Sequence, residues 1–119
     1  QSSITTSSYR VAEGGMEYVN IYSVRSTARL LDVLKGKMIR VGTSLEAKKS
    51  VNELKKIASG DKPVLIILGN EEKGISDIVK SNCDEQIIIP FAGMSQGKKC
   101  NIDSLNVAQA ASIIFYNLL

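Results

Sequence analysis

The sequence predicts a single α/β domain in which a parallel sheet is flanked by helices. Three short runs rich in Ile and Val read as strands: Met38–Thr43, Pro63–Leu68 and Ile87–Ile89. These runs alternate with stretches of helical periodicity, which is typical of parallel strands joined by helical crossovers. The chain has 119 residues, of which 44% are hydrophobic. That length supplies the core of one such domain but not of two.

Three further elements are predicted before the first of these strands. A short helix is predicted near Ser8–Glu13, ended by the glycine pair that starts at Gly14. Tyr18–Ser23 predicts a strand, and Arg25–Lys35 predicts an amphipathic helix with Gly36 just beyond its end. One face of that helix is apolar: Ala28, Leu31 and Leu34.

The middle of the chain predicts a second amphipathic helix over Lys48–Ala58. Its inward side chains are apolar: Val51, Leu54, Ile57 and Ala58. Its outward side chains are more typical of a solvated face than of a binding site: Lys48, Lys49, Lys55 and Lys56. The next strand, Pro63–Leu68, is expected to be central, with Pro63 where the missing N–H does least harm. A loop then leads into a short helix that ends near Lys80.

The C-terminal part predicts a strand that stops abruptly and a buried helix. Pro90 ends the run Ile87–Ile89, so backbone groups become available to a ligand there. Ser104 can cap the helix that follows, and from Leu105 onward apolar or small residues cover almost its whole circumference. A strand end thus meets a helix N-terminus, which is where open α/β sheets bind ligands.

Composition narrows the possible chemistry. The net charge of +3 is compatible with nucleic acid but more typical of an ordinary solvated surface. There is no His, and Cys83 and Cys100 are too few for a zinc site. We therefore expect neither a metal nor His-based acid/base catalysis. A disulfide between the two cysteines stays open, although a reduced compartment is the simpler interpretation.

Hydropathy predicts a soluble protein. No apolar run approaches the roughly 20 residues of a membrane span, and the N-terminus has no charged-then-apolar signal pattern. The chain begins at Gln1 without a Met, and its first residues read as the interior of a longer sequence, so we expect a fragment of a longer protein.

The loop Gly69–Gly74 combines glycines with charged residues. Gly69 directly follows a predicted strand, so the backbone can approach a ligand there, while Glu71, Glu72 and Lys73 supply charge. The loop lacks the Gly-Lys-Ser/Thr ending of a phosphate loop and the three-glycine dinucleotide fingerprint, and adjacent carboxylates repel phosphate. It therefore favours a neutral or cationic ligand, unless it is a plain strand-to-helix turn.

Two stretches together resemble a known family. Leu68–Ser76, followed by Ile88–Gly93 and Ser104–Val107, resembles the second and third signature motifs of the SpoU (TrmH-like) branch of the SPOUT RNA 2′-O-ribose methyltransferases. The resemblance continues more loosely through Gly15–Tyr22 and Val41–Thr43 and covers most of the chain. The Gly-Met-Glu stretch is most similar to members that methylate a ribose of large-subunit ribosomal RNA, including mitochondrial ones.

The resemblance implies a cofactor, a knot and a set of site residues. S-adenosylmethionine would lie bent between the strand-end loops, and the C-terminal part would form a trefoil knot. Cofactor contacts would come from Thr43, Leu68, Gly69, Asn70, Ile89, Leu105 and Asn106. Catalytic polar groups would be Glu71, Ser104 and Asn106, although Ser104 alone reads as a helix cap and Asn106 as a first-turn polar residue. The implied reaction transfers methyl to a ribose 2′-hydroxyl, where positioning and proton removal carry most of the catalysis.

The family's first motif, with its Asn and activating Arg, would lie upstream of this chain. The first βαβ segment would then be lacking, which would expose sheet edge or apolar face. No arginine of the chain stands in that motif pattern: Arg10, Arg25, Arg29 and Arg40. Ala108 also replaces a Ser common in the family. The alternative function is a non-catalytic knotted module that retains the cofactor pocket; a generic nucleotide-binding domain is a weaker one.

The partners implied are RNA, with ribosomal RNA favoured over transfer RNA, and a second copy of the chain. Lys98 and Lys99, at the tip of the long loop Met94–Asp103, are predicted to contact RNA phosphate, unless that loop is an insertion without function. The C-terminal helix carries enough apolar side chains for both the core and a two-fold interface: Ile113, Ile114, Phe115, Tyr116 and Leu118. The expected compartment is the mitochondrion or the cytoplasm.

Overall fold

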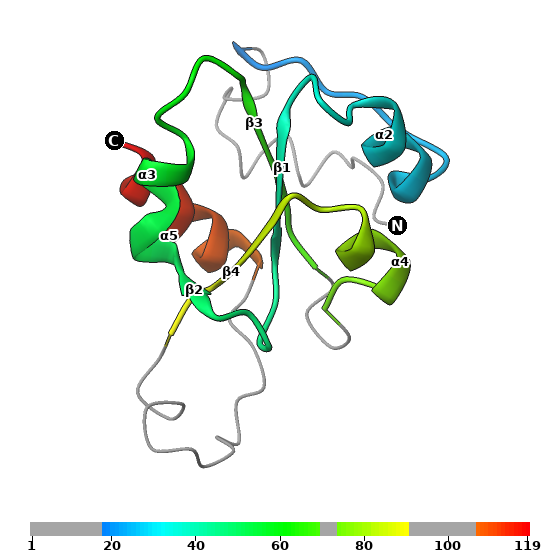
Figure 1. Cartoon of the computed structure of the whole chain (residues 1–119). Coiled ribbons are helices and arrows are strands. Elements are labelled where there is room, and N and C mark those ends of the chain that lie inside the picture. The colour runs from blue at the N-terminus through cyan, green and yellow to red at the C-terminus, as the bar shows by residue number, and fades with distance from the viewer. Residues whose placement is uncertain (1–17, 70–73, 91–106) are drawn as a thin grey trace.

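A computed structural model of the chain describes residues 18–69, 74–90 and 107–119 and shows a parallel sheet with helices on both faces (Figure 1). Its elements are, in chain order, α2 (Thr27–Val33), β1 (Ile39–Thr43), β2 (Lys49–Ser50), η2 (Val51–Glu53), α3 (Leu54–Ile57), β3 (Val64–Ile67), α4 (Asp77–Ser81), β4 (Glu85–Ile88) and α5 (Val107–Leu118). Each strand pair in the described ranges is parallel, and the strand order is β2-β4-β1-β3. The predicted α/β class with a parallel sheet is confirmed.

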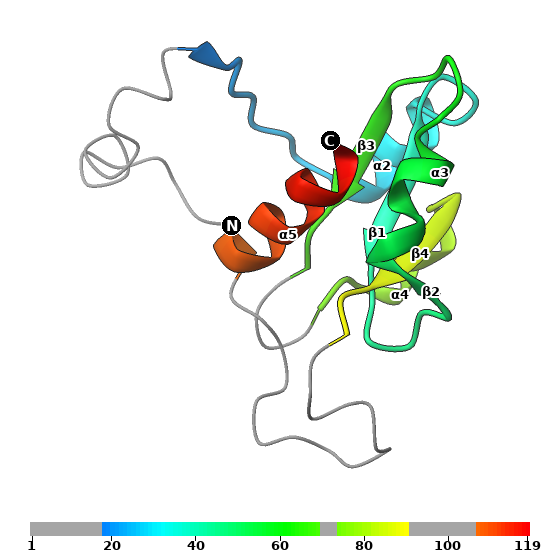
Figure 2. The ribbon, with the colours of Figure 1, turned by 90° about the vertical axis from the view of Figure 1, so that its left-hand side faces the viewer.

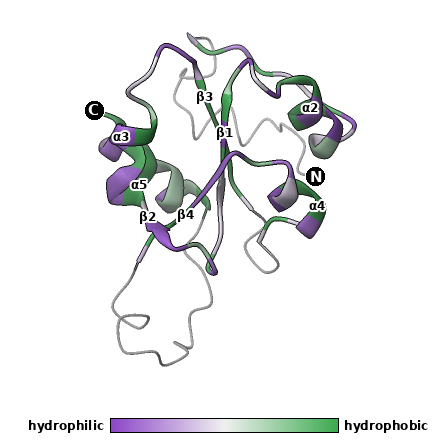
Figure 3. Cartoon of the chain, in the orientation of Figure 1, coloured by the Kyte–Doolittle hydropathy of each residue, from purple (hydrophilic) through white to green (hydrophobic). Residues whose placement is uncertain are grey.

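The main core lies between the sheet and the helices α3 and α5, which cover one face (Figures 1 and 2). Its buried side chains are Val41, Val51, Leu54, Ile87 and Ile114. Successive strand residues point to opposite faces, so Ile39 packs beside Val41 while Arg40 and Gly42 belong to the other face. Figure 3 shows hydrophilic and hydrophobic residues on different sides of α3, as expected for a helix that packs on one side.

The opposite face is covered by α2 and α4 and has a smaller buried group. Leu31 of α2 is fully buried, and Ile75, just before α4, is 7% exposed. Ser76 caps α4, since its Oγ accepts a hydrogen bond from the Val79 amide at 3.3 Å. The short helix predicted after the glycine loop is therefore confirmed.

The predicted amphipathic helix after the N-terminal region is also confirmed, although α2 is shorter than Arg25–Lys35. Ser26 begins it, because its Oγ accepts from the Arg29 amide at 3.2 Å. Gly36 follows its end with φ +79°, a conformation that favours glycine.

A buried ion pair ties this second face together. Arg40 donates from Nε and Nη2 to the two carboxylate oxygens of Asp84, at 3.0 and 2.9 Å. Its Nη1 donates to the Leu31 carbonyl at 2.9 Å, and its backbone N–H donates to Asp84 Oδ2 at 2.8 Å. The hydrogen bonds from Arg40 lower the pKa of Asp84 from 3.8 to about 2. One side chain thus joins α2, β1 and the start of β4.

Two predicted elements are wrong. Tyr18–Ser23 forms no strand, and Tyr18 and Tyr22 are 90% and 81% exposed. β-Propensity alone does not supply the neighbouring edge that a strand needs. The helix predicted over Lys48–Ala58 begins instead as strand β2, because Ser50 and Glu53 form a capping box that starts the helical turns only at residue 51.

Two further expectations need correction. β3 lies at one end of the described sheet and is not central. The C-terminal helix α5 is buried on one side only: Ile114 is in the core, whereas Phe115 and Tyr116 are 64% and 77% exposed. A single chain covers one face of this helix, so its nearly continuous apolar sequence leaves the other face open.

The helix predicted near Ser8–Glu13 and the residue Cys100 lie outside the described residues. Cys83 is a free thiol. The knot and the lack of a first βαβ segment stay predictions. Within the described ranges, no helix is long and apolar enough to cross a membrane.

Candidate ligand-binding edge of the sheet

The carboxyl ends of three parallel strands meet at one end of the sheet. Thr43, the last residue of β1, pairs with Ile87 of β4, and Gly42 before it pairs with Ile67 of β3. Leu68 and Gly69 therefore follow at the same level on one side, and Ile89 on the other. The first turn of α5 is directed toward this end of the sheet (Figures 1 and 2). This is the expected location of a ligand in an open α/β sheet.

Thr43 lies at the centre of this edge. Its Oγ1 donates to the Ile67 carbonyl across β3 at a long 3.4 Å, and the Ser44 amide donates to the Ile87 carbonyl at 3.0 Å. The half-buried hydroxyl is held weakly, so it remains able to rotate toward a ligand. The structure thus brings together four of the predicted cofactor residues: Thr43, Leu68, Gly69 and Ile89.

Gly69 and Gly74 form the neck of the glycine loop. A Cβ atom added to Gly69 would lie 2.5 Å from the Gly74 carbonyl carbon and 2.6 Å from the Ile75 nitrogen, closer than real Cβ atoms come. Gly74 has φ +68°, so its own conformation also favours glycine. The space beside Gly69 on its Cβ side is therefore occupied by the chain's own backbone, which gives a structural reason for glycine at this residue; the role of Gly69 toward a ligand stays a prediction.

Gly42 is a second close contact at this edge, and it was missed in the sequence. Its added Cβ would lie 2.8 Å from Ile75 Cδ1 and 2.9 Å from Cys83 Sγ. Burial raises the pKa of the Cys83 thiol, as expected for a packed sulfur. The available signal was a glycine inside a strand pattern, which often marks a close approach of another part of the chain.

The remaining predicted site residues lie outside the described residues: Asn70, Glu71, Lys98, Lys99, Ser104, Leu105 and Asn106. Their roles stay predictions. Among the residues that the structure describes, no three His, Cys, Asp or Glu side chains gather in a way that could hold a metal ion.

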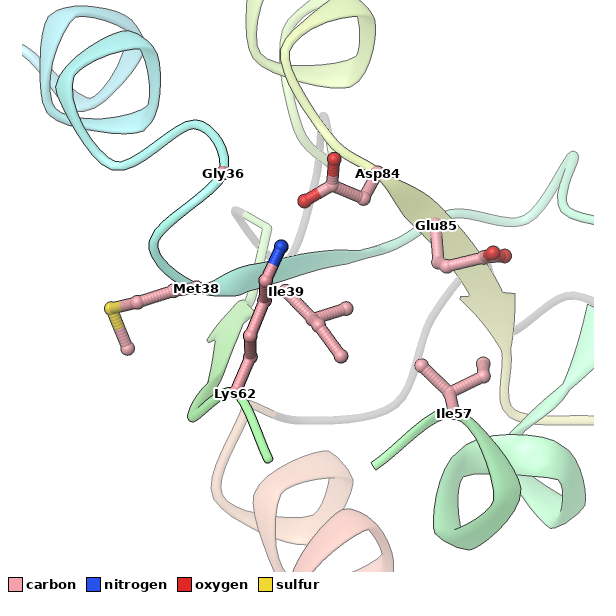
Figure 4. Close-up of a pocket in the computed structure, with 7 residues that line it drawn as sticks. All are labelled: Gly36, Met38, Ile39, Ile57, Lys62, Asp84 and Glu85. Carbon is pink, nitrogen blue, oxygen red and sulfur yellow. The ribbon is translucent and has the colours of Figure 1, made fainter. Parts of the chain in front are cut away.

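A hollow of about 320 Å³ lies at the opposite, amino end of β1 and β4 (Figure 4). It is lined by Gly36, Met38, Ile39, Ile57, Lys62, Asp84 and Glu85. Both of its carboxylates already have partners: Asp84 binds Arg40, and Glu85 accepts from Lys49 at 2.6 Å. Its acidic groups are thus committed to holding the fold together, and it is separate from the edge where the strands end.

These features define the class of the protein: a parallel α/β domain with a ligand edge where strand ends, a glycine-necked loop and a helix N-terminus converge. The sequence model of the SpoU rRNA Methylase family matches residues 1–116. The chain therefore belongs to the SpoU rRNA methylase family, as its motifs predicted.

Relatives with curated names agree with this assignment. The 23S rRNA (guanosine-2′-O-)-methyltransferase RlmB of Acinetobacter baylyi is 35% identical over 117 residues, which cover 97% of this chain and 43% of that protein. RlmB of Yersinia pestis is 31% identical over 111 residues, or 92% of this chain and 41% of that protein. The chain thus spans less than half the length of these relatives.

A solved structure supports the fold. The crystal structure of the SpoU methyltransferase AviRb from Streptomyces viridochromogenes has a TM-score of 0.75 at 26% identity, covering 95% of this chain and 42% of that one. The structure of AviRb in complex with the cofactor AdoMet has a TM-score of 0.74 at 26% identity, covering 95% of this chain and 43% of that one.

Proposed function

We propose that this chain is the cofactor-binding part of an RNA methyltransferase that uses S-adenosylmethionine to methylate a ribose 2′-hydroxyl. The observation that carries the proposal is the convergence of the ends of β1, β3 and β4 with the loop neck at Gly69 and Gly74. Family membership and the AdoMet complex of AviRb support the choice of cofactor. The names of the relatives favour an enzyme over a non-catalytic knotted module.

The described residues of the edge suit this cofactor. Thr43, Leu68, Gly69 and Ile89 offer backbone groups, one hydroxyl and apolar side chains, and none of these four carries a charge. Main-chain donors and acceptors can recognise an adenine edge, and carbonyl and hydroxyl oxygens at strand ends carry the partial negative charge that suits a sulfonium cation. When bound, S-adenosylmethionine would supply the electrophilic methyl group.

The chain's own residues would orient the reactants. Leu68, Gly69 and Ile89 would hold the cofactor through their backbones, and Leu105 would complete that wall. Because a ribose hydroxyl is a weak acid, the polar side chains of Glu71, Ser104 and Asn106 would position it and assist removal of its proton. We further propose that the segment around these residues is knotted.

The proposed substrate is large-subunit ribosomal RNA. The name of the RlmB relatives, a 23S rRNA (guanosine-2′-O-)-methyltransferase, supports this choice. Lys98 and Lys99 would contact phosphate, which fits the positive net charge of +3. A second copy of the chain would pack against the exposed face of α5, where Phe115, Tyr116 and Leu119 leave apolar area uncovered.

The proposal is tested by titrating the ¹⁵N-labelled chain with S-adenosylmethionine. We expect saturable shifts of the amide signals of Thr43, Leu68, Gly69 and Ile89. Signals at the opposite end of the sheet serve as the internal control and should not move. Absence of saturable binding by a folded chain, or shifts confined to the amino-end hollow, would contradict the proposal.

A further inference from the structure

We propose that Gly42 and Ile75 are positioning residues for the cofactor: Gly42 leaves room for Ile75, and the seated Ile75 holds together the two ends of the loop between Gly69 and Gly74. This inference rests on the proposed function, because it concerns how that cofactor site is shaped. Neither residue belongs to the predicted cofactor contacts, and of the loop only the two described ends, Gly69 and Gly74, enter this role.

The side chain of Ile75 packs over Gly42, and this contact is the seat of Ile75. Gly42 lies in the buried strand β1, on the sheet face covered by α2 and α4. The atoms above it are Ile75 Cδ1 and Cys83 Sγ, at 2.8 and 2.9 Å from the position of an added Cβ. A methyl group at residue 42 would therefore require both side-chain ends to move, and the packing around Ile75, which is 7% exposed, limits how far its Cδ1 can turn away.

Ile75 also connects this contact to the neck of the glycine loop at Gly69 and Gly74. Ile75 is 7% exposed, so its side chain is fixed by packing. Its backbone nitrogen lies 2.6 Å from where a Gly69 Cβ would be, and the carbonyl carbon of Gly74 lies at 2.5 Å. The residue whose side chain rests on Gly42 therefore also supplies the backbone that closes against Gly69.

The neck has little freedom to adjust. Ser76, the next residue, caps α4 and fixes the backbone beyond Ile75. Gly69 follows β3 directly, so the opposite side of the neck is held by the sheet. We therefore expect displacement of Ile75 to change the spacing between the end of β3 and the start of α4, beside the proposed cofactor site.

Overpacking is the first test. Gly42→Ala is compared with Gly60→Ala, a control glycine with no atom within 4 Å of an added Cβ. We expect Gly42→Ala to weaken S-adenosylmethionine binding roughly tenfold or more, the effect of a displaced well-packed side chain, and to shift the amide signals of Gly69 and Gly74. Gly60→Ala should do neither.

Compensation is the second test. The triple variant Gly42→Ala/Ile75→Val/Cys83→Ala removes Cδ1 and Sγ, the two atoms that the new methyl group would meet. It should recover most of the lost affinity and return the Gly69 and Gly74 signals toward their original positions. The Ile75→Val/Cys83→Ala double variant is its background control.

Truncation separates positioning from simple loss of stability. Ile75→Ala removes the seated side chain, and Leu31→Ala removes another buried side chain, from α2 on the same sheet face. Both should lower the unfolding midpoint, but only Ile75→Ala should weaken cofactor binding at a temperature where both are folded. This pair decides the question even when Gly42→Ala does not fold.

The outcomes distinguish the two proposals. If the folded wild-type chain binds no S-adenosylmethionine, the proposed function fails, and the neck is still judged by the Gly69 and Gly74 signals. Unchanged signals and affinity in folded Gly42→Ala would overturn the positioning role. So would equal losses of affinity in Ile75→Ala and Leu31→Ala.

Discussion

Arg40 has the largest energetic consequence that we expect from a single polar side chain. Its side chain is 5% exposed, whereas that of its partner Asp84 is 39% exposed, so the ion pair lies at the boundary between core and solvent. The hydrogen bonds that Arg40 donates to Asp84 raise the pKa of Arg40, so the buried guanidinium stays charged. Burial of the charged Arg40 guanidinium is therefore tolerated only because the Asp84 carboxylate faces it.

Asp84→Asn should lower the free energy of unfolding by about 2 kcal/mol, because the buried guanidinium loses its counter-charge but the site is partly open to water. Urea unfolding measures this change. Glu85→Gln, which breaks the neighbouring exposed pair with Lys49, is the matched control and should cost much less. Equal losses in the two variants would contradict a special role for the buried pair.

The same pair predicts how stability depends on pH. The pKa of Asp84 is about 2 in the folded chain against an ordinary value of 3.8, so between these values the unfolded chain binds more protons. The contribution of Asp84 is complete above pH 3.8 and is lost as the pH falls toward 2. Urea midpoints of wild type and Asp84→Asn should therefore converge over this window; a constant difference would exclude this linkage.

At the level of single residues, the sequence predicted a strand over Met38–Thr43, which is confirmed as β1, but not what its side chains meet. The partners of Arg40 and Gly42, namely Asp84, Cys83 and Ile75, come from segments more than 30 residues away in the sequence. Spacing within a strand carries no information about such contacts, so neither the ion pair nor the seat of Ile75 was predictable.

At the level of elements, local sequence signals predicted that a helix or strand exists better than they predicted which elements lie next to it. Gly36 follows a helix end as predicted, and Ser26 and Ser76 cap α2 and α4; such signals act within one turn. The position of β3 at the end of the described sheet was not predictable, since an apolar run reads the same in a central strand and at an edge. Tyr18–Ser23 has the composition of a strand but forms none, because composition does not show whether a neighbouring strand is present.

The two sides of α5 should respond differently to mutation. Ile114→Ala should lower the free energy of unfolding by roughly 3 kcal/mol, since the side chain is 1% exposed in the main core. Phe115→Ser/Tyr116→Ser should change monomer stability little, because both rings are exposed. If a second copy covers this face, the double variant should shift sedimentation from dimer to monomer. A dimer that persists in the double variant would rule out this face as the interface.

At the level of the whole molecule, the ligand edge was predictable in part. The family resemblance implied that Thr43, Leu68, Gly69 and Ile89 lie together, and the parallel strands do end at one side of the sheet. The reason for glycine at residue 69 was not predictable, since it depends on the path of the loop backbone. The hollow at the amino end was missed because its lining comes from four separate segments.

Charge predicts how the molecule should meet RNA. Binding to a large-subunit ribosomal RNA fragment should weaken with salt, and Lys98→Ala/Lys99→Ala should reduce the slope of log K against log salt by roughly 1 to 2. Lys35→Ala/Lys37→Ala, two exposed lysines before the amino end of β1, is the control of equal charge. Equal reductions in both pairs would mean that only net charge matters.

The burial of Ile114 against Val41, Val51, Leu54 and Ile87 also has a consequence for the order of folding. On a ribosome, the strands and α3 are made before α5, so their apolar face stays uncovered until α5 has left the exit tunnel. Contacts this distant in sequence form slowly once the chain is available. Until α5 is available, the apolar side chains that Ile114 covers have no helix to pack against, so we expect this interval to be the one in which the nascent chain is most open to aggregation or to a chaperone.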